Sequence, residues 1–405
     1  MPTQPRIAIR RLAAARAISV TGSEATFIAL MVAIYSATHS TVWMSASLFL
    51  IIGAQGVFTP LLGALGDAVD RRRVMIASEL CAAAATGAMA VTGAPAALVA
   101  LAFCGAVAQS PFFSASTAAV PNLVSPGEVT WANSTISIGR NLGALLGPVL
   151  GGAAAGLLGP GFVFAANTVL VTGSAATIAT VRGSFADADP RDGEDHLDLR
   201  AGFRFVAAEP VLRLVTLAWI VLLGLLGPVL VAELPLARSF GMGAFGYGLI
   251  SACWGGGAIV GSFLGPRIVR RDERRAMVAG CAVIGGGLAT VAVAPVFTVV
   301  LLGMVSAGIA EGTVTVAEQG ILQRRTPDAV RSRATAGTEA AAMVAYALSL
   351  PTAGLVIGAI GVRGAYLLAS GACATAALIL VAAMRALDTP RIQPDPCFAV
   401  EPAPP

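Results

Sequence analysis

The side chains that could do chemistry in this chain are a few carboxylic acids set inside long apolar runs. Glu24, Glu311, Glu318 and Glu339 lie in such runs, together with one arginine, Arg140. A charged group at the centre of a bilayer costs at least about 2.5 kcal/mol on insertion scales, so each of these residues requires an explanation. The functional explanation is that the acids bind protons or cations in a central cavity. The alternative is an internal ion pair, for example between Arg140 and Glu339.

Uncharged polar residues occur in the same apolar runs and are expected to line the same cavity. They are Gln55, Gln109, Asn133, Asn141 and Tyr346. Glu311 and Glu318 are seven residues apart and therefore share one helix face, and the same interval separates Glu339 from Tyr346. Gln109 and Glu311 are 202 residues apart, which places a polar group at the same depth in each half of the chain.

The composition argues against the common enzyme classes. Lysine is absent, and all 26 basic residues are arginine, so neither a P-loop ATPase nor a Schiff-base mechanism is available. The two histidines, His39 and His196, lie in no metal-binding pattern, and the six cysteines show no C-x-x-C spacing. No pairing of a nucleophile with a base is visible. The sequence therefore predicts no enzymatic activity, no metal, no cofactor and no nucleic-acid partner.

Length and hydropathy instead indicate a membrane protein. Of the 405 residues, 56% are apolar and only 12% are charged, about half the usual globular share of roughly 25%. Twelve spans of about 20 residues would use roughly 240 positions. Twelve apolar segments can be delimited: Ala17–Thr38, Val42–Leu65, Val74–Thr92, Ala96–Val120, Val129–Leu158, Gly161–Val181, Leu212–Leu236, Gly243–Val269, Ala276–Ala294, Val296–Gly320, Ser332–Ile360 and Gly364–Leu387.

The distribution of arginine predicts how these spans are oriented. Twenty-three of the 26 arginines fall in the termini and in alternate connections, whereas only Arg238 and Arg363 fall in the others. Because positively charged loops stay in the cytoplasm, both termini are expected there, in a multi-pass protein of a bacterial inner membrane. Glu79 and Glu233 lie near the ends of their spans and are expected at the membrane interface.

The chain divides into two similar halves. The segment SPGEVTWAN at 125–133 is echoed by TPDAVRSRA at 326–334, and a long helix with a proline, Pro148 or Pro351, follows each. A Gly-rich break then comes at Gly159–Gly161 or at Gly361–Gly364. The sequence predicts an all-α membrane protein with twelve transmembrane helices in two pseudo-symmetric six-helix bundles. The bundles cover residues 1–182 and 211–387, with a cytoplasmic loop at 183–210 that contains an amphipathic helix, Leu199–Ala208, and a Pro-rich cytoplasmic tail at 388–405.

Two motifs occur in the first half of this arrangement. The first, G-x-L-x-D-x-x-D-R-R-R, lies between the second and third spans. It comprises Gly63, Leu65, Asp67, Asp70, Arg71, Arg72 and Arg73. The second, G-x-x-x-G-P-x-x-G-G, lies in the fifth span. It comprises Gly143, Gly147, Pro148, Gly151 and Gly152.

With these motifs, the whole chain resembles the major facilitator superfamily. The first motif is similar to the signature loop of that superfamily, with Ala68 and Asp70 as departures, and its DRRRVM form resembles exporters of the enterobactin-exporter and macrolide-efflux type. The second resembles the antiporter motif of the drug-efflux branches. The resemblance implies a monomeric secondary transporter in which Asp67 latches the halves near Ser332, unless the arginines serve topology alone.

The second motif has a physical interpretation of its own. Gly143, Gly147 and Gly151 recur every four residues and therefore line one helix face that permits tight packing. We expect this face to pack against a helix of the other half when the outer side is closed, with Pro148 bending the helix. Ordinary packing without bending is the alternative.

The expected function follows from the energy source. Since no ATPase motif is present, work must come from an ion gradient, and a proton moving down 100 mV supplies about 2.3 kcal/mol. Four acids against one arginine favour neutral or cationic lipophilic substrates. The sequence thus predicts proton-coupled efflux of an antibiotic or similar natural product. A proton-coupled importer of a small metabolite and a transporter-like protein without transport remain as alternatives.

Overall fold

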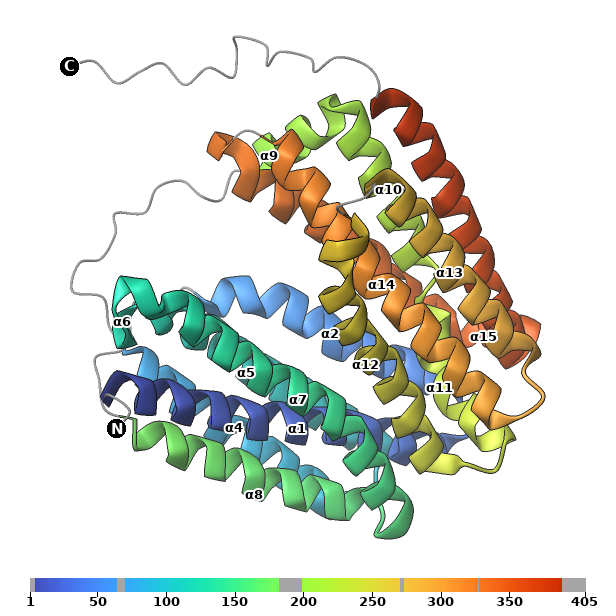
Figure 1. Cartoon of the computed structure of the whole chain (residues 1–405). Helices are drawn as coiled ribbons and strands as arrows, with labels where there is room; N and C mark the ends of the chain where they lie inside the picture. Colours follow the sequence, from blue (N-terminus) through green and yellow to red (C-terminus); the bar gives the residue numbers. More distant parts are fainter. Residues whose placement is uncertain (1–3, 64–69, 182–198, 270–272, 327, 388–405) are drawn as a thin grey trace, which may run out of the picture.

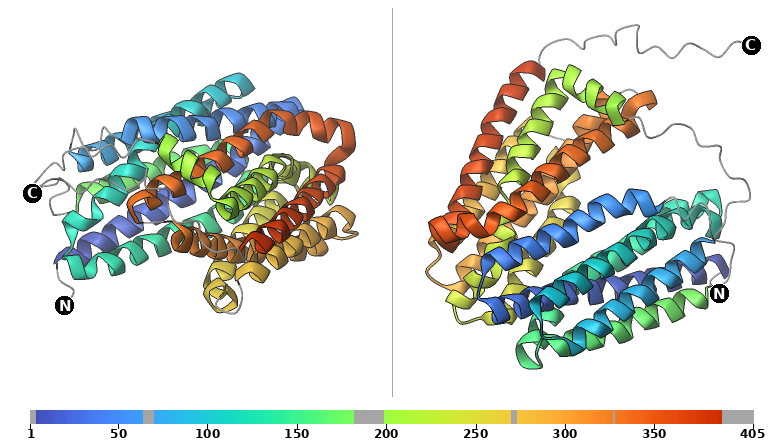
Figure 2. Two further views of the ribbon diagram at one scale, coloured as in Figure 1. Left: turned by 90° about the horizontal axis from the view of Figure 1, so that it is seen from above. Right: turned by 180° about the vertical axis from the view of Figure 1, so that it is seen from behind.

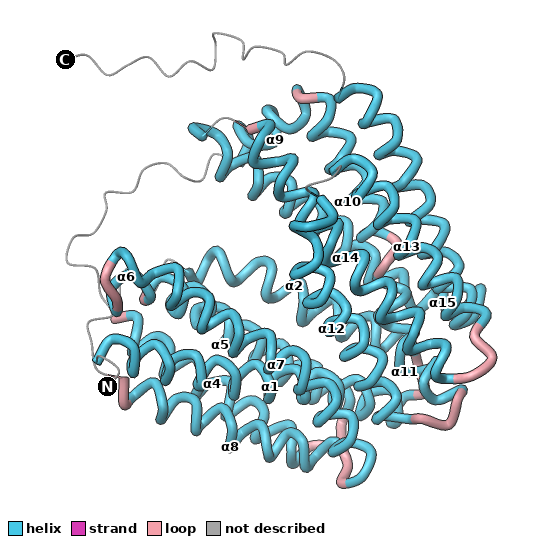
Figure 3. The backbone as a smooth tube through the Cα atoms, viewed as in Figure 1, coloured by secondary structure: helices cyan, strands magenta, loops and turns pink. Residues whose placement is uncertain are grey.

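The computed structural model describes residues 4–63, 70–181, 199–269, 273–326 and 328–387, and the regular elements within these ranges are all helical (Figure 3). The first half contains α1 (Gln4–Thr38), α2 (Thr41–Gly63), α4 (Arg71–Val91), α5 (Pro95–Ala118), α6 (Val120–Leu123), the 3-10 helix η1 (Pro126–Glu128), α7 (Val129–Leu157) and α8 (Pro160–Ala179). The second contains α9 (Leu199–Ala208), α10 (Pro210–Gly224), α11 (Gly227–Ser239), α12 (Gly243–Val269), α13 (Glu273–Val293), α14 (Phe297–Arg325) and α15 (Asp328–Leu387).

Ten helical segments of the described residues are long and apolar enough to cross a membrane. One of them joins α10 and α11, which are separate helices, so the expected seventh span is interrupted near Leu225. Another lies within α15, where the expected eleventh and twelfth spans follow each other directly. The 29-residue helix α7 is not among the ten. The large side chains that stay exposed include Val91, Leu157 and Phe263, which suits contact with lipid tails.

Two glycines at corresponding positions turn the chain between paired helices. Gly159, between α7 and α8, has φ 86°, and Gly361, inside α15, has φ 74°. Residues other than glycine rarely adopt this left-handed conformation, so these positions end one helix and start the next. Both lie within the Gly-rich breaks expected from the sequence. The short helix expected at Leu199–Ala208 is also present, as α9.

The helices form two groups that diverge from one shared end (Figures 1 and 2). Helices α1 to α8 make up the first group and α10 to α15 the second, and they meet through α7 with α12 and through α2 with α15. We call the end where they meet the far end; it holds His39, Gly159 and Gly361. The opposite end, where the groups stand apart, holds the start of α1 with Arg6, the start of α4 with Arg72 and the end of α14 with Arg324, and we call it the arginine-rich end.

The hydrophobic core follows the same division. The larger core cluster crosses between the two groups and contains residues of α1 only from Ala25 onwards, such as Ile28 and Met31, with Tyr247 of α12. The arginine-rich end of the first group has a separate cluster that includes Ile9, Phe112 and Ile178. The far end is therefore packed as one body, whereas this end of the first group packs only within itself.

Candidate functional site

A cavity of about 340 Å³ lies among the helices of the first group. Glu24 of α1, Gln55 of α2 and Gln109 of α5 line it, so three of the residues selected from the sequence come together. Asn167 of α8 also lines the cavity and was not expected there. Its buried Oδ1 has no hydrogen-bond partner among the described residues, and Gly22 of α1 leaves the space for it.

The glycine face of α7 packs against α1 of the same half, so the expected partner from the other half was wrong. A Cβ atom at Gly143 would lie 2.8 Å from the carbonyl oxygen of Ala17, and one at Gly151 would lie 2.8 Å from that of Ala25. At Gly147 it would lie 2.5 Å from Cβ of Glu24. The motif resembling that of antiporters therefore supports the backbone that carries the cavity acid.

Other residues of the same motif do reach the second half. A Cβ atom at Gly152 would lie 2.6 Å from the carbonyl oxygen of Ala244 in α12, and one at Gly248 would collide with the carbonyl of Pro148. Backbone meets backbone here because neither helix presents a side chain. The sequence correctly predicted that the motif closes a tight contact, but this contact rests on Pro148 and Gly152 rather than on the four-residue glycine repeat.

In the second group, the acids lie beside aromatic side chains. Glu311 of α14 is partly buried and approaches the indole of Trp254. Tyr346 of α15 interacts electrostatically with both Glu311 and Glu233. These contacts draw α11, α12, α14 and α15 around one polar region.

Glu233 of α11 is buried, with 5% of its surface exposed, so the expected interfacial position was wrong. Its Oε2 accepts a hydrogen bond of 2.8 Å from Ser251 of α12. Tyr247 and Tyr366 are completely buried nearby, and neither hydroxyl has a hydrogen-bond partner among the described residues. Tyr247 interacts electrostatically with both Glu233 and Glu24, which links the polar regions of the two halves. The break in the expected seventh span lies directly before Gly227 and Pro228, a dipeptide that is typical of helix starts and chain breaks and therefore a local signal for it.

Glu79 of α4 is the second acid whose expected interfacial position was wrong, because no part of it is exposed. Its Oε1 accepts a hydrogen bond of 3.0 Å from Ser174 of α8. Ser19 of α1 and Gln109 of α5 approach the same carboxyl group, and Arg16 attracts it. The sequence held a weak signal for this cluster: Ser19 and Glu79 both lie within the apolar segments.

Several predicted residues lie apart from the main cavity. Arg140 and Asn141 of α7 line a separate cavity of about 300 Å³ with residues of α12 that include Ser262. Among the described residues, no ion pair joins Arg140 to Glu339; Arg140 instead repels Arg16. Glu339 is exposed and repels Glu318, so this part of α14 and α15 holds two acids in proximity.

Asn133 is exposed near the start of α7 and lines neither the cavity with Glu24 nor the cavity with Arg140. Its expected place in a central cavity is therefore not supported. Among the described residues, no group of three or more His, Cys, Asp or Glu side chains could hold a metal ion.

The Arg-rich motif begins at Gly63, where α2 ends, and continues through Asp67, which lies outside the described residues. Asp70 caps α4 by accepting a hydrogen bond of 2.8 Å from the backbone N–H of Arg72, an arrangement that stabilises helix starts. The Arg72 guanidinium donates to the carbonyl oxygen of Ala179 at the end of α8. Arg71 is buried and Arg73 is exposed. This end of the motif therefore ties α4 to α8.

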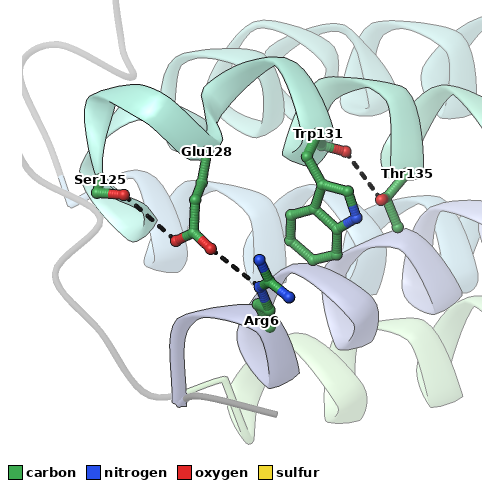
Figure 4. Close-up of polar contacts among 5 residues, drawn as sticks. All are labelled: Arg6, Ser125, Glu128, Trp131 and Thr135. Carbon is green, nitrogen blue, oxygen red and sulfur yellow. Dashed lines mark hydrogen bonds and ion pairs between the residues drawn. The ribbon is translucent and has the colours of Figure 1, made fainter.

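A second set of contacts braces the arginine-rich end (Figure 4). Arg6 of α1 forms an ion pair of 2.9 Å with Glu128, and its guanidinium lies 5.3 Å from the ring centre of Trp131 in α7. Ser125 donates to the other carboxylate oxygen of Glu128. The repeated SPGE segment thus connects the start of α1 to the start of α7.

At the far end, the two halves are joined by polar contacts that the sequence did not indicate. Arg238 of α11 donates a hydrogen bond of 2.6 Å to Oγ of Ser36 and lies 4.7 Å from the ring centre of Tyr35, both in α1. Thr41 of α2 donates to the carbonyl oxygen of Gly354 in α15. These contacts join elements more than 200 residues apart, which local sequence patterns do not reveal.

Comparison with known proteins agrees with this architecture. Residues 12–271 and 224–396 each match the Major Facilitator Superfamily. No curated protein matches the chain significantly in sequence. The nucleoside transporter NupG has a similar fold, at 14% identity and a TM-score of 0.76 over 93% of this chain and 99% of that one.

Two further solved structures are similar. A bacterial homologue of the human lysosomal transporter Spinster, inward-facing and occupied, gives 12% identity and a TM-score of 0.75 over 98% of this chain and 100% of that one. A D-xylose–proton symporter gives 16% identity and a TM-score of 0.68 over 92% and 97%. At these identities the likeness concerns the fold alone. Taken with the matches along the sequence, the helices described above show that the chain belongs to the Major Facilitator Superfamily, as a multi-pass membrane transporter.

Proposed function

We propose that this protein exports a lipophilic, neutral or cationic small molecule, such as an antibiotic, in exchange for protons. The observation that carries the proposal is the cavity of about 340 Å³, in which the carboxyl group of Glu24 faces mostly apolar walls. Such a surface suits a lipophilic guest, and its acid can hold either a proton or a cationic group. Glu311 provides a corresponding acid in the second half.

The proposed arrangement in the membrane has twelve spans in two six-helix bundles, residues 1–182 and 211–387, which work as a monomer. Two of the spans lie in α15 on either side of Gly361, and α7 supplies another. The positions of the arginines support cytoplasmic termini in a bacterial inner membrane. The arginine-rich end then faces the cytoplasm, and the packed far end makes this an inward-open state ready to receive substrate from inside.

The coupling proposed here uses one set of sites for both ligands. A proton that reaches Glu24 or Glu311 from outside removes the negative charge that holds a cationic substrate, so proton binding and substrate release occur together. Alternating access requires that the far end open and the arginine-rich end close between these events. Glu318 and Glu339, which repel each other, and Arg140 lie toward the arginine-rich end and adjust the charge of the route to the cytoplasm.

Efflux of ethidium, a lipophilic cation, tests the proposal in cells that lack their own pumps. We expect the wild-type protein to speed ethidium loss from loaded cells and a protonophore to abolish this effect. Glu24→Gln and Glu311→Gln should each reduce the efflux at least tenfold with unchanged abundance, because neither amide can release a proton. Glu273→Gln, which changes a surface ion pair with Arg324, is the matched control.

Other outcomes would favour other functions. Faster ethidium uptake, driven by an inward proton gradient, would indicate an importer. Wild-type efflux rates in both acid variants would contradict the coupling role of Glu24 and Glu311. A neutral lipophilic antibiotic should be tested in parallel. If the protein exports only neutral molecules, it will not speed ethidium efflux, but it will still give the cells resistance to that antibiotic, and a protonophore will abolish the resistance.

Asp67 is proposed to latch the cytoplasmic side of the halves when the inner side closes. It lies outside the described residues, so its place in the latch remains a prediction from the motif. Asp67→Asn should slow transport and raise labelling of cysteines placed at the cytoplasmic entrance, without loss of folded protein. Unchanged labelling with unchanged transport would leave the motif with a role in topology alone.

A further inference from the structure

The first half holds a buried acid that the exchange described above does not use. Glu79 is completely enclosed between α1, α4, α5 and α8, and one of its carboxylate oxygens has no hydrogen-bond partner among the described residues. The other accepts a hydrogen bond of 3.0 Å from Ser174. A buried carboxyl with one unpartnered oxygen is costly, because desolvation of that oxygen is not compensated.

Glu79 lies beside the cavity that contains Glu24, nearer than the cavity's α4 residues to the start of that helix. Ala82 and Thr86 line this cavity, and they follow Glu79 at intervals of three and seven residues, so all three share one face of α4. Gln109 both lines the cavity and approaches the Glu79 carboxyl group. Ser19, on the α1 face that carries Ser23, approaches it as well. Polar side chains therefore connect the cavity to the buried acid.

The neutral partners of Glu79 suit an acid that changes its protonation state. Serine hydroxyls and the glutamine amide can each donate a hydrogen bond or accept one. Ser174 donates to the carboxylate and also lies 3.2 Å from the carbonyl oxygen of Ala15, so rotation of its hydroxyl can satisfy either state. A structural ion pair would need no such adaptable surroundings.

The charged groups around Glu79 favour release of a proton on the cytoplasmic side. Arg16 of α1 is buried one turn from Ser19, attracts the Glu79 carboxylate, and donates a hydrogen bond of 3.0 Å to Ser116 of α5. Arg140 of α7 adds a second positive charge, which repels Arg16.

Among the other ionisable groups around Glu79, Glu24 is the acid across the cavity. Helices α2 and α8 carry no ionisable side chain, and α5 carries only Cys104. Glu79 is eight residues from the start of α4, or about 12 Å along the helix.

We propose that Glu79 is a second proton-binding residue, which receives the proton from the cavity and passes it to the arginine-rich end. The inference rests on the proposed proton-coupled export. The proton leaves the Glu24 carboxyl group, crosses through water that Gln109 orients by hydrogen bonds to the Glu79 carboxylate, and is then released to water at the cytoplasmic side. The carboxylate that remains is balanced by Arg16, and no other reactant takes part.

Two transport modes of purified protein in liposomes separate this role from a structural one. Ethidium efflux driven by a pH gradient requires net proton movement, whereas exchange of ethidium at equal pH on both sides does not. For Glu79→Gln we expect gradient-driven efflux to fall at least tenfold while exchange stays within about twofold of wild type. Ser174→Ala should shift the pH at which driven efflux is half-maximal and keep exchange.

A double variant tests the alternative that Glu79 only neutralises Arg16. If that were its role, Arg16→Gln would make Glu79→Gln harmless, and the double variant would regain driven efflux. We expect the double variant to stay uncoupled with normal exchange. Restored driven efflux, wild-type driven efflux in Glu79→Gln, or parallel loss of both modes in folded protein would each overturn the inference. If wild-type efflux itself ignored the pH gradient, the proposed function would fail first, which is a distinguishable result.

Discussion

Gly147 of α7 has no room for a side chain because α1 passes directly over it. Even a Cβ atom there would lie 2.5 Å from Cβ of Glu24 and 2.8 Å from the carbonyl oxygen of Thr21. Gly147, one of the glycines of the motif, is thus the residue against which Glu24 packs. For the proposed export, Gly147 therefore matters through the position of Glu24, and not through a seal between the halves.

Gly147→Leu should therefore displace Glu24 and weaken coupled efflux. Overpacking of this kind costs typically 1–3 kcal/mol, so we expect a lower thermal midpoint but folded protein at near-normal abundance. Ethidium efflux should fall at least tenfold, or proton leak into vesicles should rise. Gly173→Leu in α8, where nothing lies within 4 Å of a built Cβ, is the control and should change neither. Full efflux with no added leak in Gly147→Leu would contradict this role.

At the level of helices, the crossing of α7 and α12 closes the far end by backbone contact. Gly248 of α12 lies against the carbonyl of Pro148, and Gly152 of α7 lies against Ala244. The contact between α2 and α15 is similar, since a Cβ atom at Gly354 would lie 2.6 Å from Cα of Val42. Two such crossings, one through each pair of helices, allow the halves to approach closely without interlocking side chains.

Gly248→Ala should open the far end. A methyl group at this position has to push α12 away from α7, which favours the state in which the two halves separate there. We expect a membrane-impermeant maleimide to label Thr41→Cys at the far end several times faster in the Gly248→Ala background. Gly255→Ala, on the same helix with nothing within 4 Å of its built Cβ, provides the matched background. Equal labelling in both backgrounds would show that the crossing does not control closure.

At the scale of the whole molecule, the two halves act as bodies that share a core only at the far end. The larger hydrophobic cluster crosses between them, whereas the arginine-rich end of the first half has its own cluster around Phe112. Opening the far end therefore has to separate apolar surface that is packed together here. The hydrogen bond from Arg238 to Ser36 lies at the rim of this surface and has to break in the same movement.

A cross-link between Ser36→Cys and Arg238→Cys should hold the molecule in this state and stop transport. In a cysteine-free background, a bifunctional thiol reagent with a reducible spacer should abolish ethidium efflux, and reduction should restore it. The control pair, Arg11→Cys with Thr180→Cys, replaces a contact within the first half, in which Arg11 donates to the carbonyl oxygen of Thr180. We expect that pair to transport normally after cross-linking. Efflux that persists in the first cross-linked pair would contradict movement between the halves.

The linear pattern of residues predicted the apolar helices of the described residues, most of their positions and the Gly-rich breaks at Gly159 and Gly361. Apolar length and glycine are local properties, so a linear pattern records them. It also selected Glu24, Gln55 and Gln109, because a polar residue inside an apolar run is conspicuous wherever the run packs.

Which helix lies opposite each face becomes visible only in the folded arrangement. The four-residue spacing of Gly143, Gly147 and Gly151 predicted a tight contact, but periodicity carries no information about the partner, which is α1. The same reason explains Glu79 and Glu233. Their positions along the chain indicated an interface, yet their burial depends on neighbours such as Ser174 and Ser251, which come from distant segments or face them only after folding.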